Sequence, residues 1–150
     1  MKINCLSLLP VLLLTACGGS RDGSEDQLRE AVDSFAVSYF NYDFNKARRF
    51  CTDDSEKWLQ FAASNVQQED VDLLRQQEEP ATVDVDEWDY TSDSTASVHV
   101  NVHNYLRMDS IGKAGRMTDE GQYVLNAVIH QGKWFIRMAD LPRSEKRSHD

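Results

Sequence analysis

The chain has 150 residues and a formal net charge of −9, because it holds 25 acidic and 16 basic side chains. So acidic a chain repels phosphate backbones, which disfavours a role in nucleic-acid binding. A domain of this size buries roughly two-thirds of the surface of its unfolded chain, which is enough for one hydrophobic core.

Residues 1–16 have the organisation of an export signal. Lys2 is the one charged side chain among them, and residues 5–14 form an apolar stretch interrupted only by Ser7 and Pro10. About ten residues at a rise of ~1.5 Å cross only half of a ~30 Å hydrocarbon core. We therefore expect a cleaved signal peptide rather than a membrane-spanning helix.

The motif Leu14-Thr15-Ala16-Cys17 resembles the lipobox of bacterial lipoproteins. In that family the cysteine thiol receives a diacylglyceryl group, the chain is cut before the cysteine, and the new amine is acylated. The resemblance implies that Cys17 is lipidated and that several acyl chains hold the protein at a membrane. Gly18, rather than Asp, follows the cysteine, and by the family's sorting rule this implies the outer membrane, on its periplasmic or its surface side. An ordinary secretory signal with a coincidental cysteine is the alternative.

Cleavage before Cys17 removes one Lys and no acid, and leaves 134 residues with a formal charge of −10. Residues 17–24 are rich in Gly, Ser and charge and are predicted to be a lipidated, flexible tether. A folded domain is expected over residues 25–141, and a polar tail that frays is expected over residues 142–150. Cys51 would be the remaining free thiol, so no intramolecular disulfide is expected, and its apolar helical setting predicts a buried side chain rather than a reactive one.

The first half of the domain has helical periodicity. Ser24 and Gln27 have the spacing of a capping box, and apolar residues then recur at three- and four-residue steps up to Phe40. Asp43 is expected to cap a short second helix after a turn at residues 41–43. A third helix is expected beyond residues 52–55, and a fourth over residues 66–77, ended by Pro80.

After Pro80 the period changes to two, which predicts strands over residues 82–90, 96–103, 123–130 and 133–139, with a charged loop at 109–120. In the second strand, four apolar side chains share one face and four polar ones share the other: Ala96, Val98, Val100 and Val102 against Ser97, His99, Asn101 and His103. A bulge near Asp86-Glu87 would be needed to bring Trp88 and Tyr90 inward. Gln131-Gly132 is typical of a tight hairpin turn. The predicted class is α+β, with N-terminal helices packed on a curved four-stranded antiparallel meander.

Three segments resemble the nuclear transport factor 2-like (cystatin-like, SnoaL-like) superfamily: Phe35-Ala36-Val37-Ser38-Tyr39-Phe40, Asp43-Phe44-Asn45-Lys46-Ala47 and Gly132-Lys133-Trp134-Phe135-Ile136. The resemblance covers about residues 25–141. It implies a cone-shaped fold, in which a curved sheet wraps around helices, with a pocket at the open end. It also implies frequent dimerisation through the outer face of the sheet.

Aromatic side chains are the main candidates for a pocket wall, although residues of this kind are also common in cores. The principal candidates are Tyr39, Trp58, Trp88, Tyr90 and Trp134, with Tyr42, Asp43, Tyr105 and Tyr123 as further ones. His99 and His103 are four residues apart on one strand, about 13 Å at ~3.3 Å per residue, so they cannot chelate one metal ion by themselves. A solvated or dimeric outer face is expected for this pair, and they would line the pocket only if the valines faced outward. Asp89 is the one candidate general base for isomerase chemistry.

These observations favour a non-enzymatic, membrane-anchored envelope protein without a cofactor or bound metal. Its partner would be a small apolar ligand, a peptide or a protein, and it could form a homodimer. Two alternatives stay open. One is a small enzyme of the isomerase or dehydratase kind, and the other is a structural accessory of a larger envelope complex, which would expose a large apolar patch.

Overall fold

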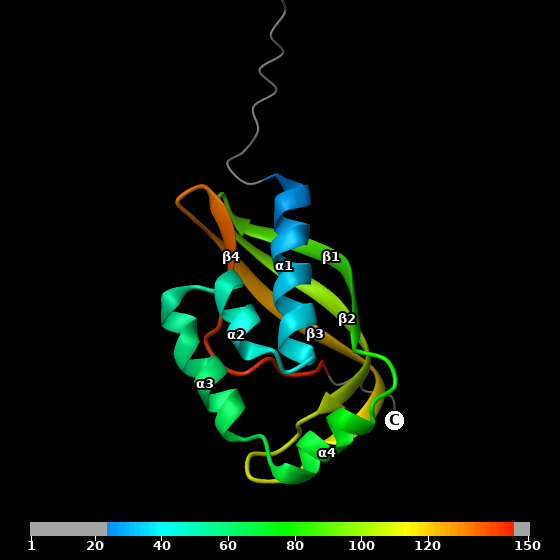
Figure 1. The fold of residues 1–150 in the computed structure, drawn as a ribbon. Coiled ribbons are helices and arrows are strands. Elements are labelled where there is room, and N and C mark those ends of the chain that lie inside the picture. Colours follow the sequence, from blue (N-terminus) through cyan, green and yellow to red (C-terminus); the bar gives the residue numbers. More distant parts are fainter. Residues whose placement is uncertain (1–23, 146–150) are drawn as a thin grey trace, which may run out of the picture.

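Figure 1 shows the computed structural model of the chain, which describes residues 24–145. The signal peptide, Cys17 and most of the predicted tether lie outside the described residues. The helical half comprises α1 (Glu25–Phe40), α2 (Phe44–Ala47), α3 (Glu56–Ser64) and α4 (Gln68–Gln76), with short 3-10 turns at Arg48–Phe50 and Asp53–Ser55. The strands β1 (Thr82–Ser92), β2 (Thr95–Arg107), β3 (Arg116–His130) and β4 (Lys133–Arg137) follow.

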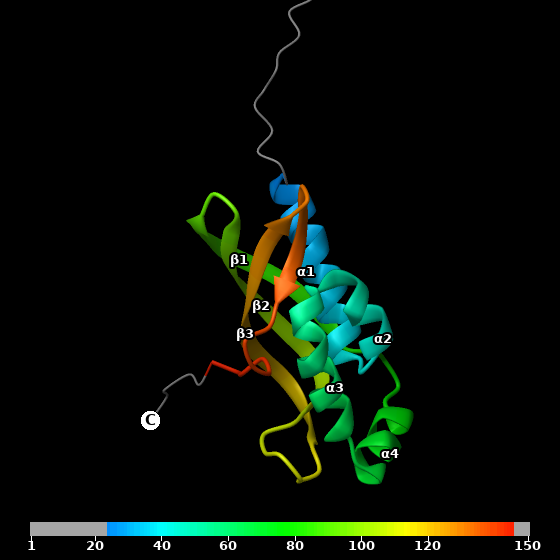
Figure 2. The same cartoon turned by 90° about the vertical axis from the view of Figure 1, so that its left-hand side faces the viewer.

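The α+β prediction is confirmed. The four strands form one antiparallel sheet in the order β1-β2-β3-β4. The helices cover one face of the sheet, and Figure 2 shows the sheet and the helices as two layers seen from the side. Helix α1 contacts all four strands, so it forms the centre of the helical layer.

Helix α1 begins at the predicted N-cap residue and packs as its apolar periodicity predicts. The Ser24 hydroxyl accepts a hydrogen bond from the Gln27 backbone N–H at 3.3 Å, and Glu25 and Asp26 lie in the first turn, where negative charge is stabilised. Its apolar stripe is buried against the sheet, and the fully or almost fully buried members are Leu28, Val32, Phe35, Ala36 and Phe40. Burial of large apolar side chains of this kind stabilises the fold by about 1.5–3 kcal/mol each.

Strand β2 carries the sheet side of the core. Ala96, Val98, Val100 and Val102 are all at most 2% exposed, whereas the intervening polar residues are partly exposed. The predicted two faces of this strand are therefore confirmed, and the valines face the helices.

The predicted bulge in β1 is confirmed. Val85 pairs with Val100 but Trp88 pairs with Val98, so Asp86 and Glu87 add one residue to β1 relative to its partner. Because of this change of phase, the Trp88 side chain packs against the core, whereas the Tyr90 side chain remains 36% exposed.

Strands β2 and β3 are longer than predicted, because their ladder continues to the pair Arg107 and Arg116. The predicted loop at residues 109–120 shrinks accordingly to the segment 108–115. The tight turn into β4 is confirmed, since Gln131 and Gly132 have φ angles of 52° and 77°, both in the left-handed region. Strand β4 ends at Arg137, two residues earlier than expected.

Residues 140–145, the C-terminal strap, differ from the fraying tail that was expected from residue 142 onward. Ser144 forms an antiparallel bridge with Tyr123, and the Glu145 backbone N–H donates to the Gln122 carbonyl at 2.8 Å. Strand β4 pairs only with residues 126–130 of β3, which leaves the edge of β3 at Gln122 and Tyr123 open. The strap satisfies backbone groups along that edge.

Across residues 24–145, no helix combines the length and the apolar character needed to cross a membrane.

Candidate functional site

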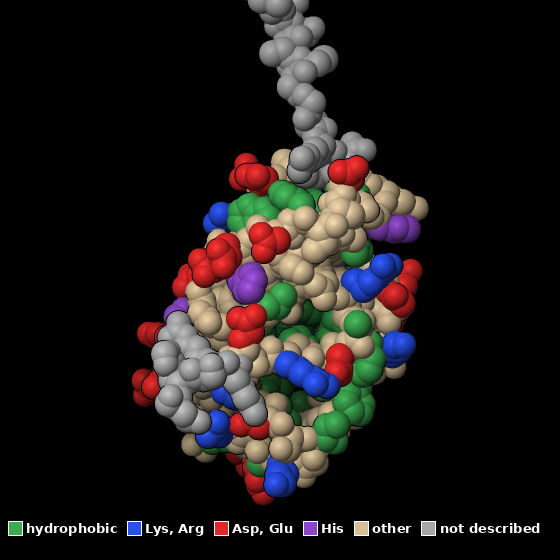
Figure 3. Space-filling view, turned by 180° about the vertical axis from the view of Figure 1, so that it is seen from behind, with side chains coloured by type: hydrophobic (Ala, Val, Ile, Leu, Met, Phe, Trp, Pro, Cys, Tyr) green, Lys and Arg blue, Asp and Glu red, His purple; other side chains and the backbone are tan. Residues whose placement is uncertain are grey.

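A cavity of about 460 Å³ lies between the C-terminal end of α1, helix α3, the C-terminal end of β2 with the loop that follows it, Tyr123 in the middle of β3, and the strap. Seen from the side opposite α1, it is a hollow with hydrophobic side chains at its base and charged side chains at its rim (Figure 3). Ligand pockets in proteins are typically about 300–1,000 Å³ in volume, so the cavity is large enough for a small molecule.

The base of the cavity is an aromatic cluster. The Phe40 ring lies 4.7 Å from the Tyr123 ring and 5.6 Å from the Tyr105 ring, centroid to centroid, and the Tyr39 ring lies 5.2 Å from the Phe40 ring. Phe44 extends the cluster, with its ring 5.5 Å from that of Tyr39. Such edge-on and tilted pairs are favourable and rigid, so the cavity has a preformed apolar surface.

Tyr105 reaches this cluster because Asn104 changes the phase of β2. Inward-facing residues of β2 are even-numbered up to Val102, yet Tyr105 is 1% exposed and packs in the core. Asn104 has a φ of 52°, in the left-handed region that Asn tolerates better than most residues. Its side-chain amide donates to the Glu79 carbonyl at 2.8 Å, which holds this conformation in place.

The tyrosine hydroxyls of the cavity are hydrogen-bonding groups. Tyr105 and Tyr123 join their hydroxyls at 3.0 Å, and the Tyr42 hydroxyl donates to the Leu106 carbonyl at 2.8 Å. Burial raises the pKa of Tyr39, of Tyr42 and of Tyr123 well above the usual range for a phenol, and the bond to Tyr105 adds to the effect at Tyr123. These groups therefore stay protonated at neutral pH and are poor general bases.

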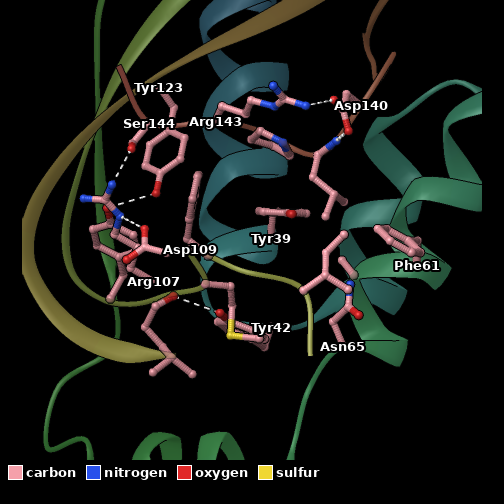
Figure 4. Close-up of a pocket in the computed structure, with 18 of the residues that line it drawn as sticks. Tyr39, Tyr42, Phe61, Asn65, Arg107, Asp109, Tyr123, Asp140, Arg143 and Ser144 are labelled. Carbon is pink, nitrogen blue, oxygen red and sulfur yellow. Dashed lines mark hydrogen bonds and ion pairs between the residues drawn. The ribbon is translucent and has the colours of Figure 1, made fainter. Parts of the chain in front are cut away.

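One side of the cavity is charged. The Arg107 Nε donates to Asp109 Oδ1 at 2.5 Å, and the Arg107 Nη2 donates to the Ser144 hydroxyl at 2.7 Å. Asp109 Oδ2 lies 3.3 Å from an Arg116 Nη2, so this carboxylate is shared between two arginines. Figure 4 shows Arg107, Asp109 and Ser144 grouped at one side of the cavity, with Phe61 and Asn65 at the other.

The rim combines an exposed ion pair with exposed apolar side chains. Arg143 Nη2 lies 2.5 Å from Asp140 Oδ2, and both side chains are at least half exposed. Phe61 on α3 is 37% exposed and Ile111 in the 108–115 segment is 69% exposed, although both line the cavity. Large apolar side chains at the mouth of an apolar cavity are available to contact a bound molecule.

Asp70 holds the 108–115 segment in place. Its carboxylate is fully buried and accepts the backbone N–H of Gly115 at 2.6 Å and that of Gln67 at 2.7 Å. The second bond is half of a capping box at the start of α4. The loop that carries Ile111 is thereby attached to a helix.

The structure places the five principal pocket candidates in different parts of the molecule. Tyr39 lines the cavity, whereas Trp58, Trp88, Tyr90 and Trp134 do not. Trp88 packs against α1, with the Arg29 Cζ 5.2 Å from its ring centroid, and the Tyr90 and Trp134 rings lie 6.3 Å apart. The ring centroids of Trp58 and Phe61 lie 6.3 Å apart.

Among the further candidates, Tyr42, Tyr105 and Tyr123 line the cavity, whereas Asp43 caps α2 by accepting the Lys46 N–H at 3.1 Å.

The other singled-out residues also lie away from the cavity. His99 and His103 lie on the sheet face opposite the core, 3.8 Å from Glu145 and 3.0 Å from Asp84 respectively. The alternative in which they line the pocket is wrong, because the valines face inward.

Asp89 is exposed on β1, and Cys51 is buried as predicted. Within residues 24–145, no group of three His, Cys, Asp or Glu side chains is arranged so that it could hold a metal ion.

The charged side of the cavity was not predicted from the sequence. Arg107, Asp109 and Ser144 come from the end of β2, the following loop and the strap, and no local spacing connects them. Phe61 could have been named as a pocket candidate, because it lies on the predicted third helix near Trp58, which was named as one.

Comparison with known proteins gives no family for the chain: no protein-family model matches it, and no curated protein matches it.

Proposed function

We propose that this chain is a lipid-anchored protein of the bacterial cell envelope whose α+β domain binds a small, largely apolar molecule in the cavity described above. The observation that carries the proposal is the cavity of about 460 Å³ with an aromatic base and with Phe61 and Ile111 exposed at its mouth. Burial of apolar ligand surface against such side chains contributes about 25 cal/mol per Å².

Binding, rather than catalysis, is favoured by the state of the polar groups in the cavity. Asp109 and Asp140 each lie against an arginine, so neither carboxylate is arranged as a free base. Tyr39, Tyr42 and Tyr123 have raised pKa values and are neutral at physiological pH. Asp89, the carboxylate that the sequence offered for isomerase chemistry, lies outside the cavity.

The anchor and the family are parts of the same proposal. The motif Leu14-Thr15-Ala16-Cys17 supports lipidation of Cys17 and residence at the outer membrane. The three segments that resemble the nuclear transport factor 2-like superfamily support membership of that superfamily, in which a pocket at the open end of the cone is expected.

Native mass spectrometry of the full chain tests the proposal. The protein would be purified from its own host and released from membranes in a mild detergent. We expect one small organic molecule bound per chain. A chain that carries no small molecule, but co-purifies with a stoichiometric protein partner, would contradict the proposal and favour an accessory of an envelope complex.

A further inference from the structure

Arg107 lies where the aromatic base of the cavity meets its charged side. Its side chain is 24% exposed, and its two hydrogen bonds, to Asp109 and to Ser144, use Nε and Nη2. A guanidinium carries five N–H donors, so most of this fork is available to a further acceptor. A planar, forked donor of this kind matches the two oxygens of a carboxylate.

The charges around Arg107 do not cancel. Asp109 is the acidic partner of both Arg107 and Arg116, so these three side chains sum to one positive charge. The neighbouring Arg143 and Asp140 neutralise each other. A positive surplus beside an apolar cavity is notable in a chain whose formal net charge is −9. An anion that binds there loses hydrogen bonds to water, and a charge-assisted hydrogen bond to Arg107 would compensate for that loss.

We infer that the cavity binds an amphiphilic monocarboxylate, with the apolar body on the aromatic cluster and the carboxylate on Arg107. The inference rests on the proposed function, and adds to it the chemical class of the ligand and the residue that selects it. A neutral molecule of the same shape would contact the aromatic cluster equally well but would leave the positive surplus without a partner. A hydrogen bond between charged groups in such a setting corresponds to about a tenfold or larger gain in affinity.

Two probes with the same apolar body separate the contributions: 2-naphthoate and its neutral amide, 2-naphthamide. Each would be titrated by calorimetry into the full chain held in phosphatidylcholine nanodiscs, with protein-free nanodiscs as the reference. We expect naphthoate to bind about tenfold more tightly than naphthamide. In Arg107→Gln, naphthoate should lose about tenfold in affinity and naphthamide should change less than twofold.

Two further arginine variants complete the test, one beside Arg107 and one away from the cavity as a control. Arg116 is 70% exposed, so Arg116→Gln should fold normally, and it should weaken naphthoate severalfold because Asp109 then neutralises Arg107 alone. Arg137 pairs with Asp54 at 3.7 Å away from the cavity, so Arg137→Gln should leave both affinities unchanged.

The outcomes distinguish the two proposals. Equal binding of both probes to the wild type, or a preference for naphthoate that survives in Arg107→Gln, overturns the carboxylate inference and leaves the apolar cavity as a binding site. Failure of both probes to bind overturns the inference together with the proposed function.

Discussion

The Tyr105 hydroxyl occupies the space that a side chain at residue 121 would need. A Cβ atom placed on Gly121 would lie 2.0 Å from the Tyr105 hydroxyl oxygen and 3.0 Å from Cζ of the same ring. Gly121 pairs with Val102 on β2, and the absence of a side chain at this position lets the Tyr105 hydroxyl approach the backbone of β3. The aromatic base of the cavity therefore depends on a glycine in the neighbouring strand.

Gly121→Ala is expected to lower the free energy of unfolding by about 1–3 kcal/mol, because the new methyl group displaces Tyr105 and breaks its bond to Tyr123. Urea unfolding of the variant measures the change. Tyr105→Phe removes the clashing oxygen, so the double variant should lose clearly less than the two single variants added together. Strict additivity would show that the close approach does not determine the packing.

Asp70→Asn is expected to destabilise the protein by about 1–3 kcal/mol, because the buried carboxylate accepts two backbone N–H groups and an amide nitrogen cannot replace one of its oxygens. Hydrogen exchange at Gly115 should also become faster, since its N–H loses its acceptor. The matched control is Asp72→Asn on the exposed side of α4, which should stay within about 0.5 kcal/mol of the wild type. Equal effects of the two variants would contradict the role given to Asp70.

Cys51 is expected to be nearly inert in the folded chain, because burial raises the pKa of its thiol from about 9 to about 11. At pH 8 this change lowers the thiolate fraction about 100-fold, and iodoacetamide should label Cys51 at least that much more slowly in buffer than in urea. Peptide mapping by mass spectrometry follows the labelling.

The same shift of the Cys51 pKa has a consequence for stability. The fold favours the protonated thiol, so this contribution to the free energy of unfolding is complete below pH 9 and is lost as the pH rises through 11. Rapid labelling of Cys51 in the folded protein at pH 8 would contradict both expectations.

Cys17→Ser is expected to abolish lipid attachment, because the serine hydroxyl cannot replace the thiol that the lipoprotein pathway alkylates. Metabolic labelling with radioactive palmitate should mark the wild type and leave the variant unmarked, and the variant should leave the outer-membrane fraction. A variant that is processed and fractionates as the wild type does would remove the basis for the anchor.

The fold could be predicted where local patterns act alone. The two faces of β2 follow from strict alternation, and the turn at Gln131-Gly132 follows from the demand for left-handed backbone. Even the bulge at Asp86-Glu87 was predictable, because without it Trp88 would face solvent.

The site was predictable only in part, because its geometry depends on contacts that are remote in sequence. Asn104 changes the strand phase and turns Tyr105 inward, and its conformation depends on a bond to Glu79, on the segment before β1. The polar composition of the C-terminal residues predicted fraying, yet Ser144 pairs with the open edge of β3 beside Arg107. The periodicity of the sequence does not show that β4 is too short to cover this edge of β3.

The most direct test of ligand binding in the cavity compares two phenylalanine variants of α3. Ala62 is buried and lines the cavity, whereas its neighbour Ala63 is exposed, so Ala62→Phe places a ring in the cavity and Ala63→Phe places it in solvent. Both would be purified from the host as full chains, checked for cooperative unfolding, and examined by native mass spectrometry. We predict that Ala63→Phe retains the bound small molecule and that Ala62→Phe loses it; retention of the molecule by both variants would place it elsewhere and contradict the account.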